Sequence, residues 1–282
     1  MSTAGSPHHA LPDGRIRRIV RFPLTWMLIG LLGVGAVSAV TADAGPVLAI
    51  VGAGAALAVY WAVMRYAAGR QTPEIASRRA GREALAGAGI GLGFVLVSAL
   101  LIAAAGGYAF SRAPGNVLSV VFTVAATAVG AAVTEELIFR GLALQALERL
   151  CGSVGAVAVT ALVFGAAHLA NPAATVGSSL AIAVEAGVLL GAAFLWRRAI
   201  WFVVGLHSAW NATVALLGIP VSGHVSPGLL ATEVSGPAWL TGGGFGLEAS
   251  IIPVAVSVLL AVPMLVLAHR RGDLIPVRRG RR

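Results

Sequence analysis

The sequence has little charge, a single cysteine and no lysine. Charged residues make up 11% of its 282 residues, whereas a soluble globular domain carries roughly 25%. Hydrophobic residues account for 58%, which is more than the cores of a water-soluble fold of this size would bury. Cys151 alone excludes a disulfide framework and a multi-cysteine metal site. The composition therefore excludes a soluble enzyme, a disordered regulator and a nucleic-acid-binding domain, and it indicates an integral membrane protein.

Eight apolar stretches are long enough to cross a bilayer, which takes about 20 residues in a helix. They cover residues 22–40, 46–64, 84–107, a run from 117, 154–169, 176–196, 200–217 and 251–268. The fourth run meets Glu135 and Glu136 and then keeps its helical pattern as far as Leu147. The sequence predicts an all-α fold, a polytopic membrane bundle of about eight transmembrane helices.

The basic residues predict the orientation of these helices. All 20 are arginines, and every one except Arg112 and Arg140 falls on the side of the two chain ends when the spans alternate. Because positive loops favour the cytoplasm, we expect both termini to be cytoplasmic, in a bacterial inner membrane. The Ala42-Asp43-Ala44 triplet offers a rival reading as a signal-peptide cleavage site. The first apolar stretch exceeds the usual ~7–15 residues of such a segment, so a retained anchor is favoured.

Spans and charge together divide the chain into segments. We expect a basic cytoplasmic tail (1–21), three N-terminal spans (22–115), a four-span core (116–217), an extracytoplasmic Gly/Pro-rich loop (218–249), a last span (250–269) and a basic cytoplasmic tail (270–282). His224 lies in the loop and is expected to be solvated.

Few polar side chains fall within the predicted spans. Because an ionisable group there costs about 2.5–3.5 kcal/mol, each is a candidate for function. They are Glu135, Glu136, Arg140, His168, Glu185 and His207, with the amide of Asn211 nearby. Glu136 and Arg140 are four residues apart and can pair on one helix face. Glu135 is rotated by about 100° from Glu136 and is expected to point into the bundle.

Helix geometry predicts that several of these groups meet. Glu135 and His168 are equally far from a turn at residues 150–153, so two antiparallel helices joined there place them at one depth. His207 and Asn211 share the face of another helix. The depths agree if residues 142–150 project partly into the cytoplasm, as Glu148 suggests. A carboxylate beside an imidazole can activate water, and a second imidazole with an amide can stabilise an oxyanion, which indicates an amidase or protease below the cytoplasmic surface.

Each of these residues also has a structural interpretation. The Glu136–Arg140 pair can join helices, and we assign it a supporting role. A single histidine would more often pack than catalyse, but the conjunction of the four positions favours catalysis. Glu185 precedes Gly187 and Gly191, whose spacing lets helices approach closely. It is expected either beside the site or lining a cavity.

Three motifs occur in order on consecutive spans: EExxxR from Glu135 to Arg140, FxxxH from Phe164 to His168, and HxxxN from His207 to Asn211. Together they resemble the CPBP family of intramembrane proteases (CAAX proteases and bacteriocin-processing proteins, or Abi). They are similar to the type II CAAX prenyl endopeptidases. The resemblance covers about a third of the chain, from residue 117 to residue 217.

The resemblance implies a role for each motif residue. Glu135 would activate water with the help of His168, and His207 with Asn211 would stabilise the oxyanion. The remaining candidates would support or surround these groups: Glu136, Arg140, Phe164 and Glu185.

No cofactor is expected, because the sequence has no HExxH helix of a zinc protease. If a metal such as zinc were bound, Glu135, His168 and His207 would be its three ligands. The expected partners are the bilayer and a membrane-embedded or membrane-surface peptide or protein, lipidated or not, and no nucleic acid. Two rival functions are a non-catalytic scaffold or bacteriocin self-immunity protein of the same fold, and a proton-coupled transporter. The lack of a paired half-repeat disfavours the transporter.

Overall fold

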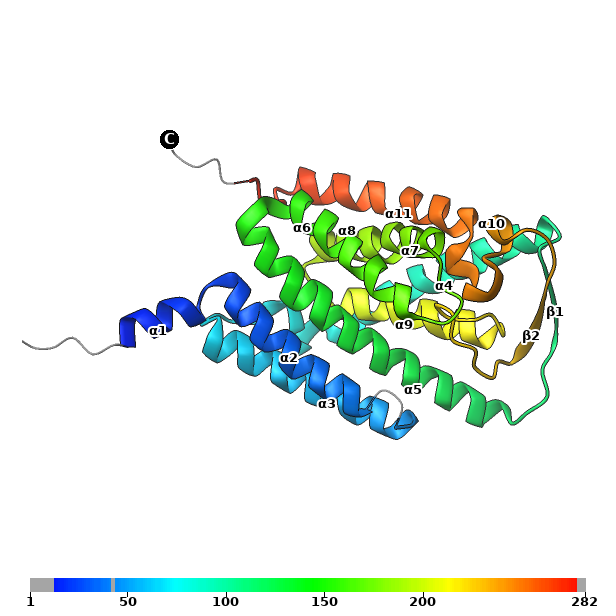
Figure 1. Ribbon diagram of the computed structural model, residues 1–282, viewed down its shortest axis with the longest axis horizontal. Coiled ribbons are helices and arrows are strands. Elements are labelled where there is room, and N and C mark those ends of the chain that lie inside the picture. The colour runs from blue at the N-terminus through cyan, green and yellow to red at the C-terminus, as the bar shows by residue number, and fades with distance from the viewer. Residues whose placement is uncertain (1–12, 42–43, 278–282) are drawn as a thin grey trace, which may run out of the picture.

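The computed structural model describes residues 13–41 and 44–277, and most of them are helical. The helices pack side by side into an elongated bundle (Figure 1). Both described ends of the chain lie at one end of this bundle, and the two short strands lie at the other. The predicted helical membrane bundle is confirmed. Parts of both predicted tails (1–12 and 278–282), and Ala42 and Asp43 of the proposed cleavage triplet, lie outside the described residues.

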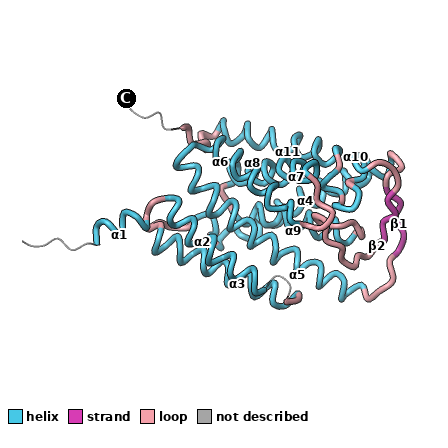
Figure 2. The backbone as a smooth tube through the Cα atoms, viewed as in Figure 1, coloured by secondary structure: helices cyan, strands magenta, loops and turns pink. Residues whose placement is uncertain are grey.

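The elements follow one another with short connections (Figure 2). The N-terminal part contains α1 (Asp13–Val20), α2 (Pro23–Thr41), α3 (Pro46–Ala62, continued by a π-helical turn, Val63–Ala67), α4 (Ala80–Ala104) and β1 (Tyr108–Arg112). The central part contains α5 (Val117–Glu136), the π-helical segment η4 (Leu137–Leu144) and α6 (Gln145–Ala167). The remainder contains α7 (Val176–Ile182), the π-helical turn η6 (Ala183–Val188), α8 (Leu189–Arg197), α9 (Ile200–Leu216), β2 (Leu230–Val234), α10 (Ala238–Thr241), the 3-10 turn η8 (Leu247–Ala249) and α11 (Ile251–Arg270).

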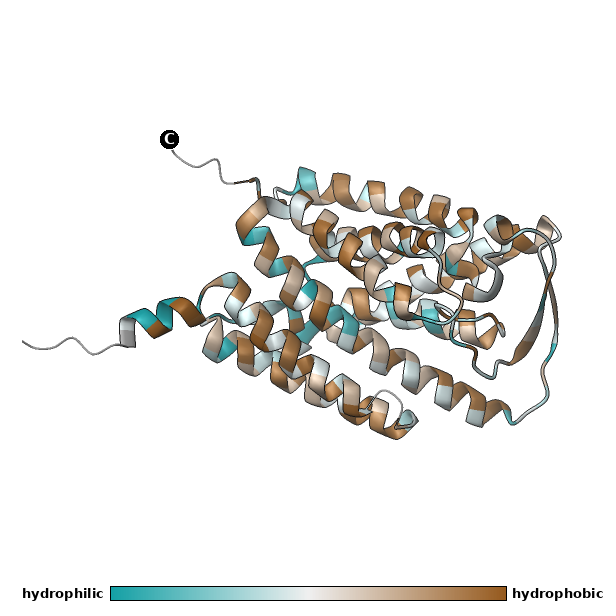
Figure 3. Cartoon of the chain, viewed as in Figure 1, coloured by the Kyte–Doolittle hydropathy of each residue, from teal (hydrophilic) through white to brown (hydrophobic). Residues whose placement is uncertain are grey.

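Six helical stretches in the described part of the chain are long and apolar enough to span a bilayer. One of them, Val117–Ala170, contains two of the predicted spans. The predicted span 200–217 corresponds to a shorter apolar helix, Ile200–Leu216. Hydrophobic residues predominate along most helices, whereas α1 is largely hydrophilic (Figure 3). Large apolar side chains such as Leu32 and Leu118 are 75% and 80% exposed, as expected for helices that face lipid.

Close contact between α4 and α9 places α9 inside the bundle. A Cβ atom on Gly205 would lie 2.1 Å from the carbonyl oxygen of Ala84, and one on Gly91 would lie 2.2 Å from that of Leu206. Small residues allow transmembrane helices to approach in this way. The interior position of α9 buries His207 and fixes the height of its motif.

The predicted turn between the fourth and fifth spans lies at Gly152, which has a left-handed φ of 74°. The chain's last described residues fold back onto this turn. The backbone N–H of Ser153 donates to the carbonyl oxygen of Ile275 at 2.9 Å, and the N–H of Ile275 donates to Oγ of Ser153 at 2.8 Å. A Cβ at position 152 would lie 2.9 Å from the same carbonyl oxygen, so the strap formed by residues 273–277 needs glycine there.

The predicted loop of residues 218–249 is more ordered than its composition suggests. Its strand β2 pairs antiparallel with β1, with Tyr108 opposite Val234 and Arg112 opposite Leu230. The hydroxyl of Tyr108 donates to the carbonyl oxygen of Thr241 at 2.5 Å. This small ribbon is the departure from the predicted all-α fold, and it satisfies backbone groups of two segments that meet at one end of the bundle.

Candidate active site

The three motif-bearing segments meet at one cavity. α5 ends beside Glu135, α6 ends just before His168, and α9 carries both His207 and Asn211. All four of these predicted catalytic side chains line a cavity of about 710 Å³. This volume is within the range of roughly 300–1,000 Å³ that is usual for ligand-binding pockets. The fold therefore gathers around one space the groups that the sequence places on separate helices.

The predicted ion pair between Glu136 and Arg140 is present and buried. Nη1 of Arg140 lies 3.0 Å from Oε1 of Glu136, and the two side chains are 2% and 0% exposed. The guanidinium also donates to the carbonyl oxygens of Ala186 at 2.5 Å and Gly187 at 3.2 Å. Arg140 thereby ties the end of α5 to η6. π-Helical segments such as η4 and η6 occur frequently at functional sites.

Glu136 has a second partner, His207, which the motif spacing does not indicate. Nδ1 of His207 lies 2.8 Å from Oε1 of Glu136. Because an ionised carboxylate only accepts hydrogen bonds, Nδ1 carries the proton in this contact. On the other side of the ring, Nε2 lies 4.0 Å from Oε2 of Glu135. The imidazole of His207 therefore stands between the two glutamates of the EExxxR motif.

His168 is oriented by the residue four positions before it. Its Nδ1 lies 2.7 Å from the carbonyl oxygen of Phe164, so Nδ1 donates and the neutral ring keeps a lone pair on Nε2. The His168 ring also packs against the Phe164 ring, with centroids 4.5 Å apart. The guanidinium carbon of Arg140 lies 5.2 Å from the centroid of the same Phe164 ring. Phe164 thus positions His168 through both its backbone and its ring.

The two adjacent glutamates have different surroundings. The side chain of Glu135 is 33% exposed, whereas that of Glu136 is fully buried. Glu135 lines the cavity, in agreement with its predicted orientation away from Arg140. Glu135 is therefore the carboxylate that a molecule in the cavity can reach, whereas Glu136 is bound to Arg140 and His207.

A comparison with protein-family models matches residues 116–213 to the family described as type II CAAX prenyl endopeptidase Rce1-like. This segment contains all three motifs and the four cavity-lining side chains. This segment is similar to the CAAX proteases, and the match covers about a third of the chain. The predicted resemblance is confirmed, and the family points to a protease. No match is found among the curated proteins or among the solved structures that were compared.

Glu185 lies within the Rce1-like segment but does not line the cavity. Its side chain is 0% exposed, and neither carboxyl oxygen has a hydrogen-bond partner among the described residues. The next two residues, Ala186 and Gly187, supply the carbonyl oxygens bound by Arg140. A Cβ on Gly187 would lie 2.6 Å from Cα of Ala161, which confirms the close helix approach expected there. Glu185 is a buried neighbour of the site.

A metal site is not assembled in the described residues. No three histidine, cysteine, aspartate or glutamate side chains in this part of the chain are close enough together to hold a metal ion. Nδ1 of both His168 and His207 is engaged by a protein acceptor. These contacts leave Nε2 of each ring available, so the alternative ligand set of Glu135, His168 and His207 stays a prediction.

Sequence reasoning missed an acidic residue of this cavity, Glu248. The cavity follows α5 from Glu135 to Val124, about 16 Å along the helix, and reaches residues of the 218–249 loop. Glu248 lies there, 2% exposed, and its Oε2 accepts hydrogen bonds from the backbone N–H of Ser222 at 2.5 Å and from its Oγ at 2.9 Å. Burial raises the pKa of Glu248 to about 7, although the Ser222 hydrogen bonds act in the opposite direction. An acid directly before an apolar helix was the available sequence signal.

The same loop places His224 on the cavity, where it is exposed. The position of the site below the cytoplasmic surface stays a prediction. The cavity extends towards the loop end of the bundle, which lies opposite the two described chain ends (Figure 1).

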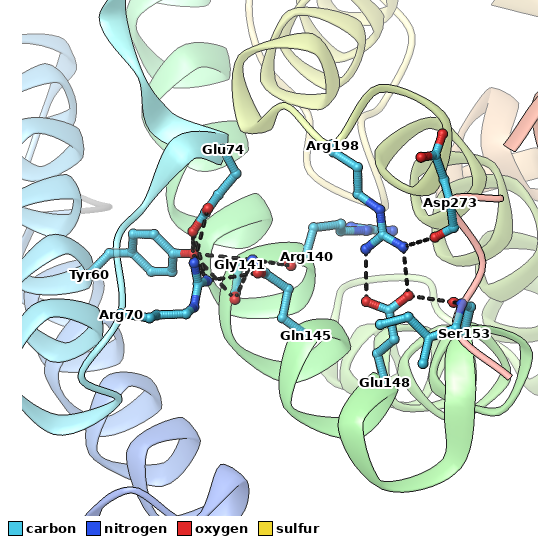
Figure 4. Close-up of polar contacts among 11 residues, drawn as sticks. Tyr60, Arg70, Glu74, Arg140, Gly141, Gln145, Glu148, Ser153, Arg198 and Asp273 are labelled. Atoms are coloured by element: carbon cyan, nitrogen blue, oxygen red, sulfur yellow. Dashed lines mark hydrogen bonds and ion pairs between the residues drawn. The ribbon is translucent and has the colours of Figure 1, made fainter. Parts of the chain in front are cut away.

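Two polar clusters lie beyond the EExxxR motif, where η4 continues into α6 (Figure 4). In the first, Arg70 donates to Gln145 at 2.7 Å, and Gln145 donates to the carbonyl oxygen of Gly141 at 2.9 Å within η4. In the second, Arg198 binds both oxygens of Glu148 at 2.7 and 2.8 Å. Glu148 is only 3% exposed, so its carboxylate faces Arg198 rather than solvent, and the expected cytoplasmic position of residues 142–150 stays a prediction. Its burial is compensated by the bidentate pair with Arg198.

Proposed function

We propose that this protein is an intramembrane endopeptidase that hydrolyses a peptide bond of a membrane-associated or lipidated substrate through a water molecule activated by Glu135. The observation that carries the proposal is the convergence of Glu135, His168, His207 and Asn211 on one cavity inside the Rce1-like segment. Proximity of a carboxylate, two imidazoles and an amide is what acid–base hydrolysis requires.

Activation of water would begin at Glu135 and His168. Glu135 is the reachable carboxylate of the pair, and Nε2 of His168 keeps a lone pair because Nδ1 is bound to Phe164. A water held between such acceptors loses a proton to the base as its oxygen attacks the carbonyl carbon. The proton can then pass to the leaving amine nitrogen, so the step needs no other reactant.

Stabilisation of the oxyanion would fall to α9. His207 and Asn211 share one helix face, and each can donate a hydrogen bond to a developing negative charge. His207 donates from Nε2 when its ring is doubly protonated, and the carboxylate of Glu136 on Nδ1 favours that form electrostatically.

The experiment that tests this proposal compares peptides released in membranes that contain the wild-type protein with those from the Glu135→Gln variant. Gln keeps the size of Glu135 and removes its basicity, so we expect the loss of specific fragments by a factor of at least about 10². The matched control is Glu233→Gln, since Glu233 is exposed on β2 and pairs only with the backbone of β1. Undiminished fragments in the Glu135→Gln membranes would favour the scaffold or immunity function instead.

We also propose that both termini face the cytoplasm, which follows from the arginine distribution. In that orientation the 218–249 loop, and with it the loop end of the cavity, lies on the extracytoplasmic side of a bacterial inner membrane.

A further inference from the structure

Hydrogen bonds hold the side chain of Glu248 in place at the loop end of the cavity. Of its two carboxyl oxygens, Oε2 accepts both hydrogen bonds from Ser222, and Oε1 accepts none from the described residues. Glu248 itself lines the cavity, so Oε1 is the carboxyl oxygen that is left for a molecule bound there. Glu248 therefore presents one free carboxyl oxygen to whatever the cavity holds.

The turn at Ser222 and Gly223, which binds Glu248, has a constrained backbone. Ser222, which supplies both hydrogen bonds, has a left-handed φ of 47°, which is costly for a residue with a side chain. The turn is held from outside because Nδ2 of Asn171 donates to the carbonyl oxygen of Ser222 at 3.0 Å. Gly223 donates to the carbonyl oxygen of Phe245 at 2.7 Å, which joins this turn to the segment that leads to Glu248.

The charges around the cavity favour a cationic guest. Its described lining residues include the carboxyl groups of Glu135 and Glu248, and no arginine. The other ionisable lining residues are His168, His207 and His224. Glu135 faces His207, whereas Glu248 has only the neutral donors of Ser222. A buried carboxylate with neutral donors and a free oxygen is most strongly stabilised by a positive charge at that oxygen.

We propose that Glu248 is a specificity-determining residue that binds a cationic group of the substrate, a lysine or arginine side chain or an amine, at the loop end of the cavity. The inference rests on the proposed peptidase function, because it assigns a substrate preference to the same cavity. A neutral residue at the same substrate position leaves the carboxyl oxygen without a partner, and this unfavourable state disfavours neutral substrates.

The experiment uses the full-length protein in detergent micelles and a set of fluorescent apolar peptides. In each peptide one position carries lysine, and in its matched twin that position carries norleucine, which has the same length and no charge. We expect the wild-type ratio of kcat/KM for lysine over norleucine to exceed one at a defined position. It should fall about tenfold in Glu248→Gln and persist in Glu248→Asp, which keeps the carboxylate. The Glu233→Gln variant is the control for a change of charge in the same loop.

A binding measurement separates this inference from the proposed function. The same peptide pairs are bound to Glu135→Gln and to the double variant Glu135→Gln/Glu248→Gln, and fluorescence anisotropy reports the Kd of each. Cleavage without a lysine preference, or with a preference that survives Glu248→Gln, overturns the role of Glu248 and leaves the peptidase intact. Preferential binding that depends on Glu248, without cleavage by the wild type, supports the cation site and overturns the peptidase. Neither cleavage nor preferential binding overturns both.

Discussion

Glu136 and His207 lie 71 residues apart in the chain and are joined by a 2.8 Å hydrogen bond between Oε1 and Nδ1. This contact links the end of α5 to the interior of α9 and sets the direction of Nε2. Nε2 of the same ring lies 4.0 Å from Oε2 of Glu135.

Replacing Glu136 by glutamine should therefore reduce turnover although Glu136 does not line the cavity. The amide keeps the shape of the carboxylate but removes its charge, so His207 loses the partner that favours its doubly protonated form. We expect kcat to fall by about 10²–10⁴ with little change in KM. Steady-state kinetics on a cleaved peptide measure this, and full turnover in Glu136→Gln would show that His207 needs no such partner.

The buried Glu136–Arg140 pair predicts different effects on stability for single and double variants. Arg140→Met leaves the carboxylate of Glu136 without its guanidinium, and we expect a loss of about 3–5 kcal/mol. Glu136→Gln/Arg140→Met removes both charges and should recover most of that stability without recovering activity. Thermal unfolding of the purified variants in detergent gives the comparison; a double variant as unstable as Arg140→Met would contradict it.

Chelation provides a test of the proposed chemistry. Because the proposed step uses Glu135 and His168 as acceptors for water, we expect cleavage to survive treatment with 1,10-phenanthroline or EDTA. The control is a zinc protease assayed in the same detergent. Loss of activity that is restored by added zinc would replace Glu135-activated water with a metal-dependent mechanism.

The pKa of Glu248, raised to about 7 by burial, predicts how substrate preference varies with pH. Below that value the carboxyl group is mostly neutral, and above it the group is mostly ionised and attracts a cation. The kcat/KM ratio of lysine to norleucine peptides should therefore rise as the pH increases from about 6 to about 8. Groups that affect both peptides equally cancel in this ratio. A ratio that stays flat in the wild type, or rises equally in Glu248→Gln, would contradict the assignment.

The orientation is tested with single cysteines placed at the two ends of the bundle. Val225 is 85% exposed in the loop, and Arg271 is exposed just after α11. In a Cys151→Ala background, Val225→Cys should react with a membrane-impermeant maleimide in intact cells, and Arg271→Cys only after permeabilisation. The reverse pattern would invert the proposed topology.

The sequence predicted most of what is local along a helix. The Glu136–Arg140 pair follows from a spacing of four residues, and the turn at Gly152 from the length of the flanking apolar runs. The contact of Glu136 with His207 depends on how deeply α9 enters the bundle. That depth depends on how closely the backbones of α4 and α9 approach at Gly91 and Gly205. The spacing of residues within one motif gives no information about this approach.

Irregular segments escaped prediction for a related reason. Glu248 reaches the cavity because the Ser222 turn and the segment before α11 are hydrogen-bonded to each other, and neither has a periodic pattern. The pairing of β1 with β2 joins segments that are separated by the whole of the Rce1-like segment. In the same way Glu148, polar and next to Arg149, suggested a solvated position, but its partner Arg198 lies 50 residues further along the chain.

The strap of residues 273–277 has a practical consequence for anyone who handles this protein. Its backbone is hydrogen-bonded to Ser153, at the turn between the helix that carries Glu135 and the helix that leads to His168. Trimming the chain before Asp273 would remove these hydrogen bonds, so a shortened form of the protein should keep residues 273–277.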